Sequence, residues 1–352
     1  MVDASVQRPR VHHTPVTGWL NDPHAVVHHE GIYHLFHQAV PAQTSWAPTI
    51  SWGHATSEDL VTWQAHPTAL EPAQDEVGCW TGCIVVPPGE QPVILYTSVA
   101  EPDLRLGRVR LAHPTDRSLS AWTPGDLLDL PLGGLDGRLQ ELRDPTVRWD
   151  GTRWRLVLGG GHADGRPVLL GWSSTDLHAW TFDGEVATGP VPAAPDQLGT
   201  AWECPQITDV DGRTIALICS WEGGETGEVF AAVGRMDGHR FLAAEPWDRI
   251  TYGRGHYAPT VFTDADGRPG VIFWIRGVAD PAGRWAGALS IPYRLAVVEG
   301  HVTLEPHPGV LATGIVTDLA TTSGHVALVE DMGISELCTG RALVGWSAAP
   351  PA

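Results

Sequence analysis

The sequence contains no lysine, so all 22 of its basic residues are arginines, and 41 acidic residues outnumber them. The formal net charge is −19. A surface of this sign repels polyphosphates, which argues against nucleic acid as a partner. No apolar run approaches the roughly 20 residues that cross a membrane. Residues 1–13 also lack an apolar core of signal-peptide length. We therefore expect neither a nucleic-acid nor a membrane partner.

Cysteine is scarce as well. There are five cysteines, an odd number, and their spacing forms no paired framework. Buried free thiols in a reducing compartment are the simplest interpretation. Together with the missing signal segment, this predicts a cytoplasmic protein. The cysteines are Cys79, Cys83, Cys204, Cys219 and Cys338.

The sequence also has little that resembles a metal site. His12-His13 looks like a pair of ligands, as do the histidines at 28–29, but adjacent residues of a strand point to opposite faces. Cys79 and Cys83 have no further ligand close to them in sequence. We predict no metal and no other cofactor.

No convincing long amphipathic helix precedes residue 310, whereas glycine (40) and proline (29) are plentiful. One pattern recurs five times: an apolar strand, a polar turn and a second apolar strand. Asp-Gly between apolar runs, which occurs in three of the copies, is a strong hairpin signal. The copies span 26–36, 85–96, 147–158, 207–220 and 261–274.

The spacing of these copies indicates the fold. Their starting points are 59, 62, 60 and 54 residues apart, and a period of this length fits one four-stranded propeller blade with its loops. We therefore predict an all-β fold, a five-bladed β-propeller that forms the catalytic domain over residues 1–310. Residues 311–352 would be a short C-terminal extension, too short for a full sandwich domain.

Chemically useful residues stand just before each hairpin. In a propeller the innermost strands lie side by side around the axis, so their matching ends converge on one mouth of the central channel. In four of the five copies a proline lies two or three residues before the first apolar residue, and a proline restricts the backbone of the residue before it. The residues four positions before the first apolar residue are Asp22, Thr81, Arg143, Glu203 and Tyr257, and Asp144 follows Arg143.

Three carboxylates and an arginine, without a His or Cys ligand set, suit the cleavage of a glycosidic bond. One carboxylate attacks or positions water, and another donates a proton to the leaving oxygen. Crowding of like charges raises at least one pKa, as a general acid needs. A single Asp-Pro is a common loop start, so the argument depends on the matched position in five copies. Aromatic walls would come from Trp19, Trp80, Trp202 and Tyr257.

Several separated motifs, in order, resemble glycoside hydrolase family 32, the β-fructofuranosidases (invertases, levanases and inulinases). The family opens with Trp-Met-Asn-Asp-Pro-Asn-Gly and also carries Arg-Asp-Pro and Glu-Cys-Pro. The similarity spans roughly residues 12–310, including a closing stretch at 284–295. The matching segments are Trp19-Leu-Asn-Asp-Pro-His-Ala25, Tyr33-His-Leu-Phe-His-Gln38, Trp52-Gly-His-Ala55, Trp80-Thr-Gly82, Arg143-Asp-Pro145, Glu203-Cys-Pro205 and His256-Tyr-Ala258.

The resemblance implies roles as well as a five-bladed propeller. Asp22 would be the nucleophile that attacks the anomeric carbon of a fructofuranosyl unit, and Glu203 the acid/base. Asp144 would stabilise the transition state, with Arg143 beside it. Residues that would hold or enclose the sugar are Asn21, Gln38, Trp52, Trp80, Thr81, Trp19 and Tyr257.

The sequence departs from the family pattern in three places. His24-Ala25 replaces Asn-Gly after Asp22, and His24 would contact the sugar or lie at the rim of the site with ordinary hydrogen bonds. Thr81 replaces a serine and keeps its hydroxyl group. About 40 residues follow the expected propeller, so the C-terminal β-sandwich of the family is expected to be missing. This leaves open whether the protein forms a homo-oligomer.

The function expected from these motifs is a retaining β-fructofuranosidase. It would cleave sucrose or short fructo-oligosaccharides through a covalent fructosyl-enzyme intermediate, without a cofactor. Three alternatives stay open at this point: a fructosyltransferase with the same intermediate, an inverting propeller glycosidase that acts on pentofuranosides, and a non-catalytic sugar-binding propeller. The linkage and length of the substrate also stay open.

Overall fold

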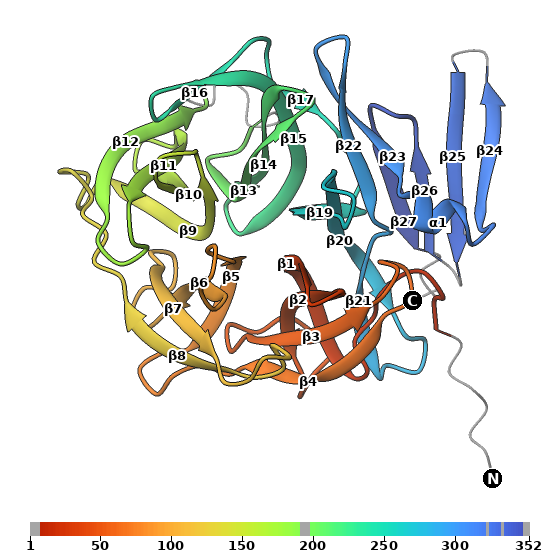
Figure 1. Ribbon diagram of the computed structural model, residues 1–352, viewed down its shortest axis with the longest axis horizontal. Coiled ribbons are helices and arrows are strands. Elements are labelled where there is room, and N and C mark those ends of the chain that lie inside the picture. Colours follow the sequence, from red (N-terminus) through yellow and green to blue (C-terminus); the bar gives the residue numbers. More distant parts are fainter. Residues whose placement is uncertain (1–7, 191–197, 322–323, 332–333, 348–352) are drawn as a thin grey trace.

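The computed structural model describes residues 8–190, 198–321, 324–331 and 334–347 (Figure 1). Its regular elements are strands, apart from one short helix, α1 (Pro308–Leu311). The all-β prediction is therefore confirmed. No helix among these residues is long and apolar enough to span a membrane.

All five expected hairpins are present. The turn of the first has positive φ at Glu30 (49°) and Gly31 (87°), and the turn of the fourth has the same at Asp211 (50°) and Gly212 (73°). Two successive positive φ angles match the right-handed twist of the flanking strands. The hairpins are β1 (Gly18–His29) with β2 (Ile32–Val40), β5 (Gly78–Val85) with β6 (Val93–Val99), β9 (Leu139–Trp149) with β10 (Trp154–His162), β13 (Ala201–Val210) with β14 (Arg213–Glu222), and β19 (His256–Thr263) with β20 (Pro269–Ala279).

Three hairpins each extend outward into a sheet of their own. The second hairpin adds β7 (Arg108–Pro114) and β8 (Trp122–Leu127). The third adds β11 (Pro167–Ser174) and β12 (Thr181–Thr188). The fourth adds β15 (Glu225–Asp237), β16 (Arg240–Ala243) and β17 (Asp248–Arg249).

The first and fifth hairpins share one nine-stranded sheet. They are joined where β1 pairs in parallel with β21 (Trp285–Leu289), Gly18 opposite Trp285 and Trp19 opposite Ala286. The pairing of strands therefore does not divide the chain into five separate four-stranded units. The remaining members of this sheet are β3 (Ser51–Ser57), β4 (Gln64–Leu70), β22 (Tyr293–Val298) and β23 (His301–Pro306).

The C-terminal residues form the fifth sheet together with one short strand that precedes the fifth hairpin. Its strands are β18 (Thr251–Tyr252), β24 (Val316–Thr321), β25 (Gly324–Asp331), β26 (Ile334–Cys338) and β27 (Leu343–Ser347). Glu336 of β26 is fully buried. Its carboxylate accepts hydrogen bonds from the Tyr293 hydroxyl (2.7 Å) and the Ile291 N–H (2.9 Å). This sheet is therefore anchored to the nine-stranded sheet, on β22 and just before it, by a buried charge. The division at residue 310 stays a prediction.

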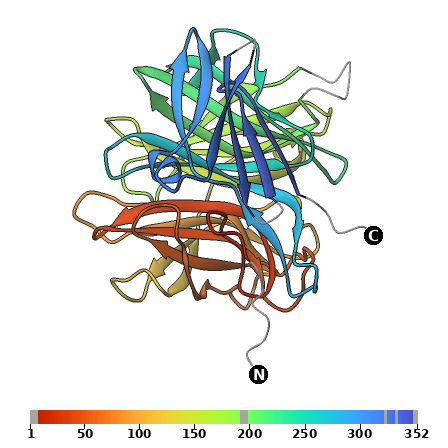
Figure 2. The ribbon, with the colours of Figure 1, turned by 90° about the vertical axis from the view of Figure 1, so that its right-hand side faces the viewer.

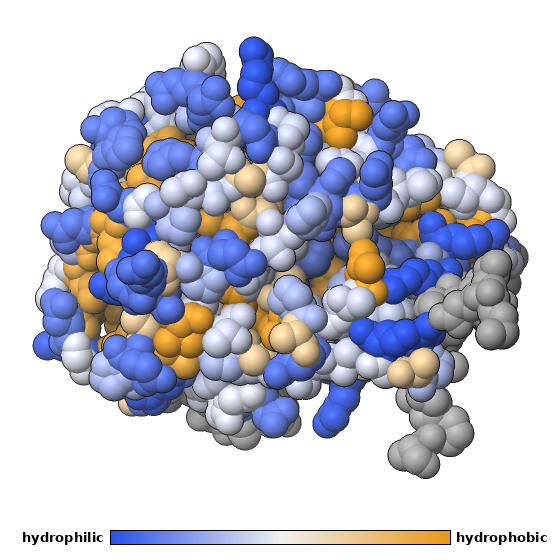
Figure 3. Space-filling model, turned by 90° about the horizontal axis from the view of Figure 1, so that it is seen from below, coloured by the Kyte–Doolittle hydropathy of each residue, from blue (hydrophilic) through white to orange (hydrophobic). Residues whose placement is uncertain are grey.

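The innermost strands form a ring of contacts. β1 contacts β5, β5 contacts β9, β9 contacts β13, β13 contacts β19, and β19 contacts β1. Figure 1 shows these strands around a common centre, and Figure 2 shows the same sheets from the side. On the face in Figure 3, hydrophilic side chains predominate and hydrophobic ones show between them.

Apolar clusters fill the spaces between neighbouring sheets. In one of them Leu95 and Val109 of the second sheet pack with Leu156 and Leu170 of the third. All four side chains are buried. The polar ends of the innermost strands are thus held by apolar packing further out.

Candidate active site

A cavity of about 500 Å³ lies where the innermost strands converge. Ten of the thirteen predicted site residues line it. The structure therefore brings together residues that are up to 238 positions apart in the sequence. They are Trp19, Asn21, Asp22, Gln38, Trp80, Thr81, Arg143, Asp144, Glu203 and Tyr257.

Each innermost strand has a register shift next to its cavity residues. Such bulges re-aim side chains and are common beside functional sites. At three of the shifts a residue other than glycine has positive φ: Asp144 (62°), Cys204 (47°) and Ala258 (49°). These conformations are unfavourable for such residues, and surrounding structure must hold them in place. The bulges thus help to aim the polar side chains into the cavity.

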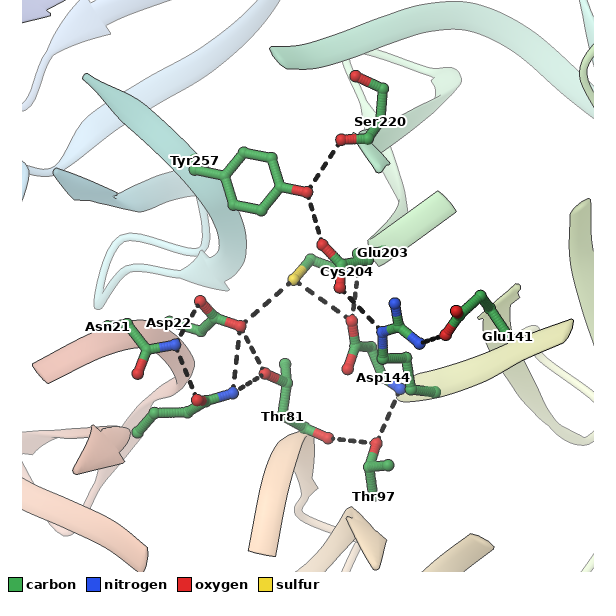
Figure 4. Close-up of polar contacts among 12 residues, drawn as sticks. Asn21, Asp22, Thr81, Thr97, Glu141, Asp144, Glu203, Cys204, Ser220 and Tyr257 are labelled. Carbon is green, nitrogen blue, oxygen red and sulfur yellow. Dashed lines mark hydrogen bonds and ion pairs between the residues drawn. The ribbon is translucent and has the colours of Figure 1, made fainter. Parts of the chain in front are cut away.

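Asp22 is surrounded by hydrogen-bond donors (Figure 4). Its Oδ2 accepts from the Thr81 hydroxyl (2.7 Å) and from Gln38 Nε2 (3.3 Å), and its Oδ1 accepts from Asn21 Nδ2 (3.0 Å). Trp19 Nε1 donates to Asn21 Oδ1 (2.9 Å), which fixes the orientation of that amide. The carboxylate is therefore held in one orientation by donors from two strands of its own hairpin and one of the next.

Burial, together with the nearby charge of Glu203, raises the pKa of Asp22 to about 6. The hydrogen bonds from Thr81 and Asn21 oppose this rise, because they stabilise the charged form. A carboxylate with this pKa is ionised at neutral pH and gains a proton in mildly acidic solution. Ionised, it can act as a nucleophile.

Glu203 lies between a guanidinium group and a phenol. Its Oε1 accepts from Arg143 Nε (2.8 Å), and its Oε2 accepts from the Tyr257 hydroxyl (2.6 Å). The Arg143 Cζ lies 5.1 Å from the centre of the Trp221 ring, so an aromatic face covers the guanidinium. Both oxygens of Glu203 are thus oriented, and this side chain can exchange a proton with a bound molecule.

Asp144 is the third carboxylate. Its Oδ2 accepts from the Cys204 N–H (2.9 Å) and lies 3.5 Å from the Cys204 sulfur, which is itself 3.7 Å from Asp22 Oδ2. Burial, together with the charges of Glu203 and Asp22, raises the pKa of Asp144 to about 7 against the opposing effect of Arg143. The cavity thus places the carboxylates of Asp22 and Asp144 on either side of one thiol.

The model of the glycosyl hydrolases family 32 N-terminal domain matches residues 12–308. The chain belongs to glycosyl hydrolase family 32. This confirms the resemblance that the motifs carry.

Among relatives of this family 32 chain is beta-fructofuranosidase, insoluble isoenzyme 2, of Oryza sativa subsp. indica, 36% identical over 334 residues that cover 84% of this chain and 54% of that protein. A sucrose-6-phosphate hydrolase of Zymomonas mobilis is 27% identical over 319 residues, which cover 85% of this chain and 61% of that one. The chain spans about half the length of the curated relatives it matches first.

Solved structures of the family share the fold. The GH32 beta-fructofuranosidase BmSUC1 of Bombyx mori superimposes with a TM-score of 0.80 at 22% identity, over 97% of this chain and 88% of that one. The sucrose-6-phosphate hydrolase of Lactobacillus gasseri gives 0.81 at 18% identity, over 98% and 88%. At these identities the likeness concerns the fold alone.

Three predicted site residues do not line the cavity, and two of them are Trp52 and His24. Trp52 was expected to hold the sugar, but it is fully buried in β3, and its Nε1 donates to the Trp80 carbonyl oxygen (3.2 Å). His24 is 2% exposed and stacks on Trp52, with 4.1 Å between ring centres. Both side chains therefore lie behind the wall of the family 32 cavity. The prediction that they contact the sugar directly is wrong.

Trp202 was also expected as a wall and is not one. Side chains alternate along a strand, so Trp202 faces away from the cavity that its neighbour Glu203 enters. It is fully buried with Val157 and Leu169 in an apolar cluster. Two neighbouring residues of one strand cannot both point into the cavity, because side chains alternate between the two faces.

Other lining residues were not predicted. Trp46, on the loop after β2, lies edge to face with Trp80, with 5.7 Å between ring centres. Glu141 contacts Arg143 from the side opposite Glu203. The unpredicted lining residues are Trp46, Leu104, Arg105, Glu141, Trp221, Gly224, Thr226 and Trp274.

Nothing in the described parts of the chain suggests a metal site, because no three or more His, Cys, Asp or Glu side chains are arranged to hold an ion. The lack of a metal or other cofactor stays a prediction.

The raised pKa of Asp144 predicts a pH-dependent cost in stability. Between about pH 4 and 7 the folded protein holds a proton here that the unfolded chain releases, so this residue makes the fold less stable as pH rises through that window. Asp144→Asn should therefore raise the free energy of unfolding at pH 8 by roughly 2 kcal/mol. At pH 4.5 it should change it little. Thermal unfolding at both values measures the difference.

The exposed variant Asp209→Asn serves as the matched control, because the Asp209 side chain is 63% exposed and outside the cavity. It should shift the unfolding temperature equally little at both pH values. An Asp144→Asn effect of the same size at pH 4.5 and pH 8 would contradict the electrostatic explanation.

Proposed function

We propose that this protein is a retaining β-fructofuranosidase that cleaves terminal fructofuranosyl units from sucrose or short fructo-oligosaccharides. The main support is one observation: Asp22, Asp144 and Glu203 come from three different innermost strands and line one cavity. Membership of family 32 and relatives named beta-fructofuranosidase favour the same conclusion. We also infer that the five hairpins are the inner halves of five propeller blades, which the ring of contacts among innermost strands supports.

In the first step of the proposed reaction the Asp22 carboxylate attacks the anomeric carbon, C2, of the fructosyl unit. The bond from C2 to the leaving oxygen breaks, and Glu203 gives that oxygen its proton. The donors around Asp22 leave its carboxylate oriented, so little reorganisation precedes attack. The product of this step is a covalent ester between Asp22 and fructose.

In the second step Glu203, now a carboxylate, takes a proton from water, and the oxygen of that water attacks C2. The ester breaks, Asp22 is released as a carboxylate, and fructose leaves. Two displacements at the same carbon retain the anomeric configuration. Asp144 accepts hydrogen bonds from sugar hydroxyls, which strengthen as positive charge develops on the ring. The walls formed by Trp19, Trp80 and Tyr257 exclude water around the sugar.

A substrate panel followed by time-resolved NMR tests the proposal. Purified protein is incubated with sucrose, 1-kestose, inulin and levan, and the first anomer released is recorded before it equilibrates. We expect β-fructofuranose from sucrose and 1-kestose. Release of the α anomer would exclude retention, and no release from any substrate would exclude the activity. Fructosylated sugars at high sucrose would show transfer through the same intermediate.

A further inference from the structure

Arg143 sits beside the side chain to which we assign the acid role. Its Nε donates to Glu203 Oε1 at 2.8 Å, and the two side chains are only 6% and 15% exposed. A guanidinium group this close, and this far from water, favours the ionised form of a carboxyl group. A general acid must hold a proton before it reacts. The site therefore needs something that limits the effect of Arg143 on Glu203.

Glu141 meets this need. It precedes Arg143 by two residues on β9, so both side chains point to the same face of the strand. Its Oε2 contacts Nη1 of Arg143, while Glu203 contacts Nε (Figure 4). Glu141 is 5% exposed and lines the cavity. One buried cation is thus shared between two carboxylates.

Tyr257, which contacts Glu203 directly, and Arg276, which lies behind the Tyr257 ring, do not take this role. The Tyr257 hydroxyl donates to Glu203 but carries no charge, since burial raises its pKa well above the ordinary value. Arg276 stacks behind the Tyr257 ring, 4.9 Å from its centre, and donates to the carbonyl oxygen of Gly227 (2.9 Å). The titratable and charged groups that face Glu203 from each element are Asp22 (β1), Glu141, Arg143 and Asp144 (β9), Cys204 (β13), Cys219 (β14), Tyr257 (β19) and, behind its ring, Arg276 (β20).

We propose that Glu141 is a positioning residue: it holds Arg143 against Glu203 and balances the charge of Arg143, so that Glu203 can keep the proton it donates. This inference rests on the proposed function, because it assumes the acid role of Glu203. No motif in the sequence pointed to Glu141. Its contribution is electrostatic and passes through Arg143.

The variant Glu141→Gln tests the proposal, because it keeps the shape and an oxygen that accepts from Arg143 but removes the charge. The measurement is the pH profile of kcat/KM for sucrose, whose basic limb reports loss of the proton from the acid. Arg143 would then act on Glu203 without balance, so the basic limb should move to lower pH by about one unit. The acid limb should move less, because Asp22 has no contact with Arg143.

Arg143→Gln is the second variant, and its expected shift has the opposite sign. Without this cation, the charged groups nearest to Glu203 are the carboxylates of Asp22, Glu141 and Asp144, so the basic limb should move to higher pH even though the rate falls. Glu185→Gln is the matched control: Glu185 lies on β12, outside the cavity, and pairs with Arg166. Its profile should superimpose on that of the wild type.

A Glu141→Gln profile with both limbs unmoved, whether or not the rate falls, would overturn the proposal, since a purely structural role lowers the rate at every pH. If Glu141→Gln does not fold, an Arg143→Gln profile with an unmoved basic limb, or one moved to lower pH, would overturn it instead. A wild-type protein that releases fructose from no substrate would refute the proposed function, and the two failures are therefore distinguishable.

Discussion

Asp22→Asn should lower kcat/KM for sucrose by about three orders of magnitude or more, because an amide cannot form the covalent bond to C2 on which both steps depend. The substitution also places an NH2 group among the donors from Asn21, Gln38 and Thr81. Thermal unfolding must therefore accompany the kinetics, so that loss of activity is not confused with loss of the fold. For the wild type, the acid limb of the pH profile should lie near pH 6, where Asp22 gains its proton.

The intermediate can be observed directly. Wild-type protein quenched in acid during turnover of sucrose should gain the mass of one fructosyl unit, and a peptide that contains Asp22 should carry it. Asp209→Asn, the same change at an exposed position, should retain full activity. Activity of Asp22→Asn within a factor of ten of wild type, with no adduct on Asp22 in the wild type, would exclude the nucleophile role.

Much of this site could be predicted because its signals are local. Short turns fix the hairpins, and the proline after Asp22, Asp144 or Cys204 lies at the irregular part of its innermost strand. Equal spacing then implies that these positions meet. Counting along the sequence could not, however, reveal the bulges, which depend on the partner strand. A bulge changes the face of the strand to which the following side chains point. In β1 the register shifts between Pro23 and Ala25, on either side of His24.

The unpredicted parts of the site depend on contacts that sequence spacing does not encode. Trp221 stands at the end of β14 and Trp46 on a loop, so neither shares the position from which the site was derived. Glu141 belongs to the right strand but precedes the motif by two residues. The parallel pairing of Gly18 with Trp285 joins the two ends of the ring, and no local turn signals it. These features depend on which side chains meet in the folded chain, and local turn signals do not encode that.

Glu203→Gln should distinguish an acid from a residue that only binds the sugar. With sucrose, whose leaving oxygen needs a proton, kcat should fall by about 10²–10⁴-fold. With an aryl fructoside, whose phenolate leaves without a proton, formation of the intermediate should be much less affected. Breakdown would then limit the rate, because water no longer has a base, and a burst of phenol should precede slow turnover.

Azide adds a test of the second step. It attacks C2 as an anion and needs no general base, so it should accelerate turnover of the aryl fructoside by Glu203→Gln and yield fructosyl azide. It should not accelerate Asp22→Asn in the same way, since that variant forms no intermediate. Arg143 and Tyr257 donate to different oxygens of Glu203 and so orient its carboxyl group. A glutamine has a single side-chain oxygen, so it can accept from only one of these two donors in the same geometry. Equal losses on sucrose and the aryl fructoside, without rescue by azide, would mean that Glu203 orients the substrate and that the proton comes from another group in the cavity.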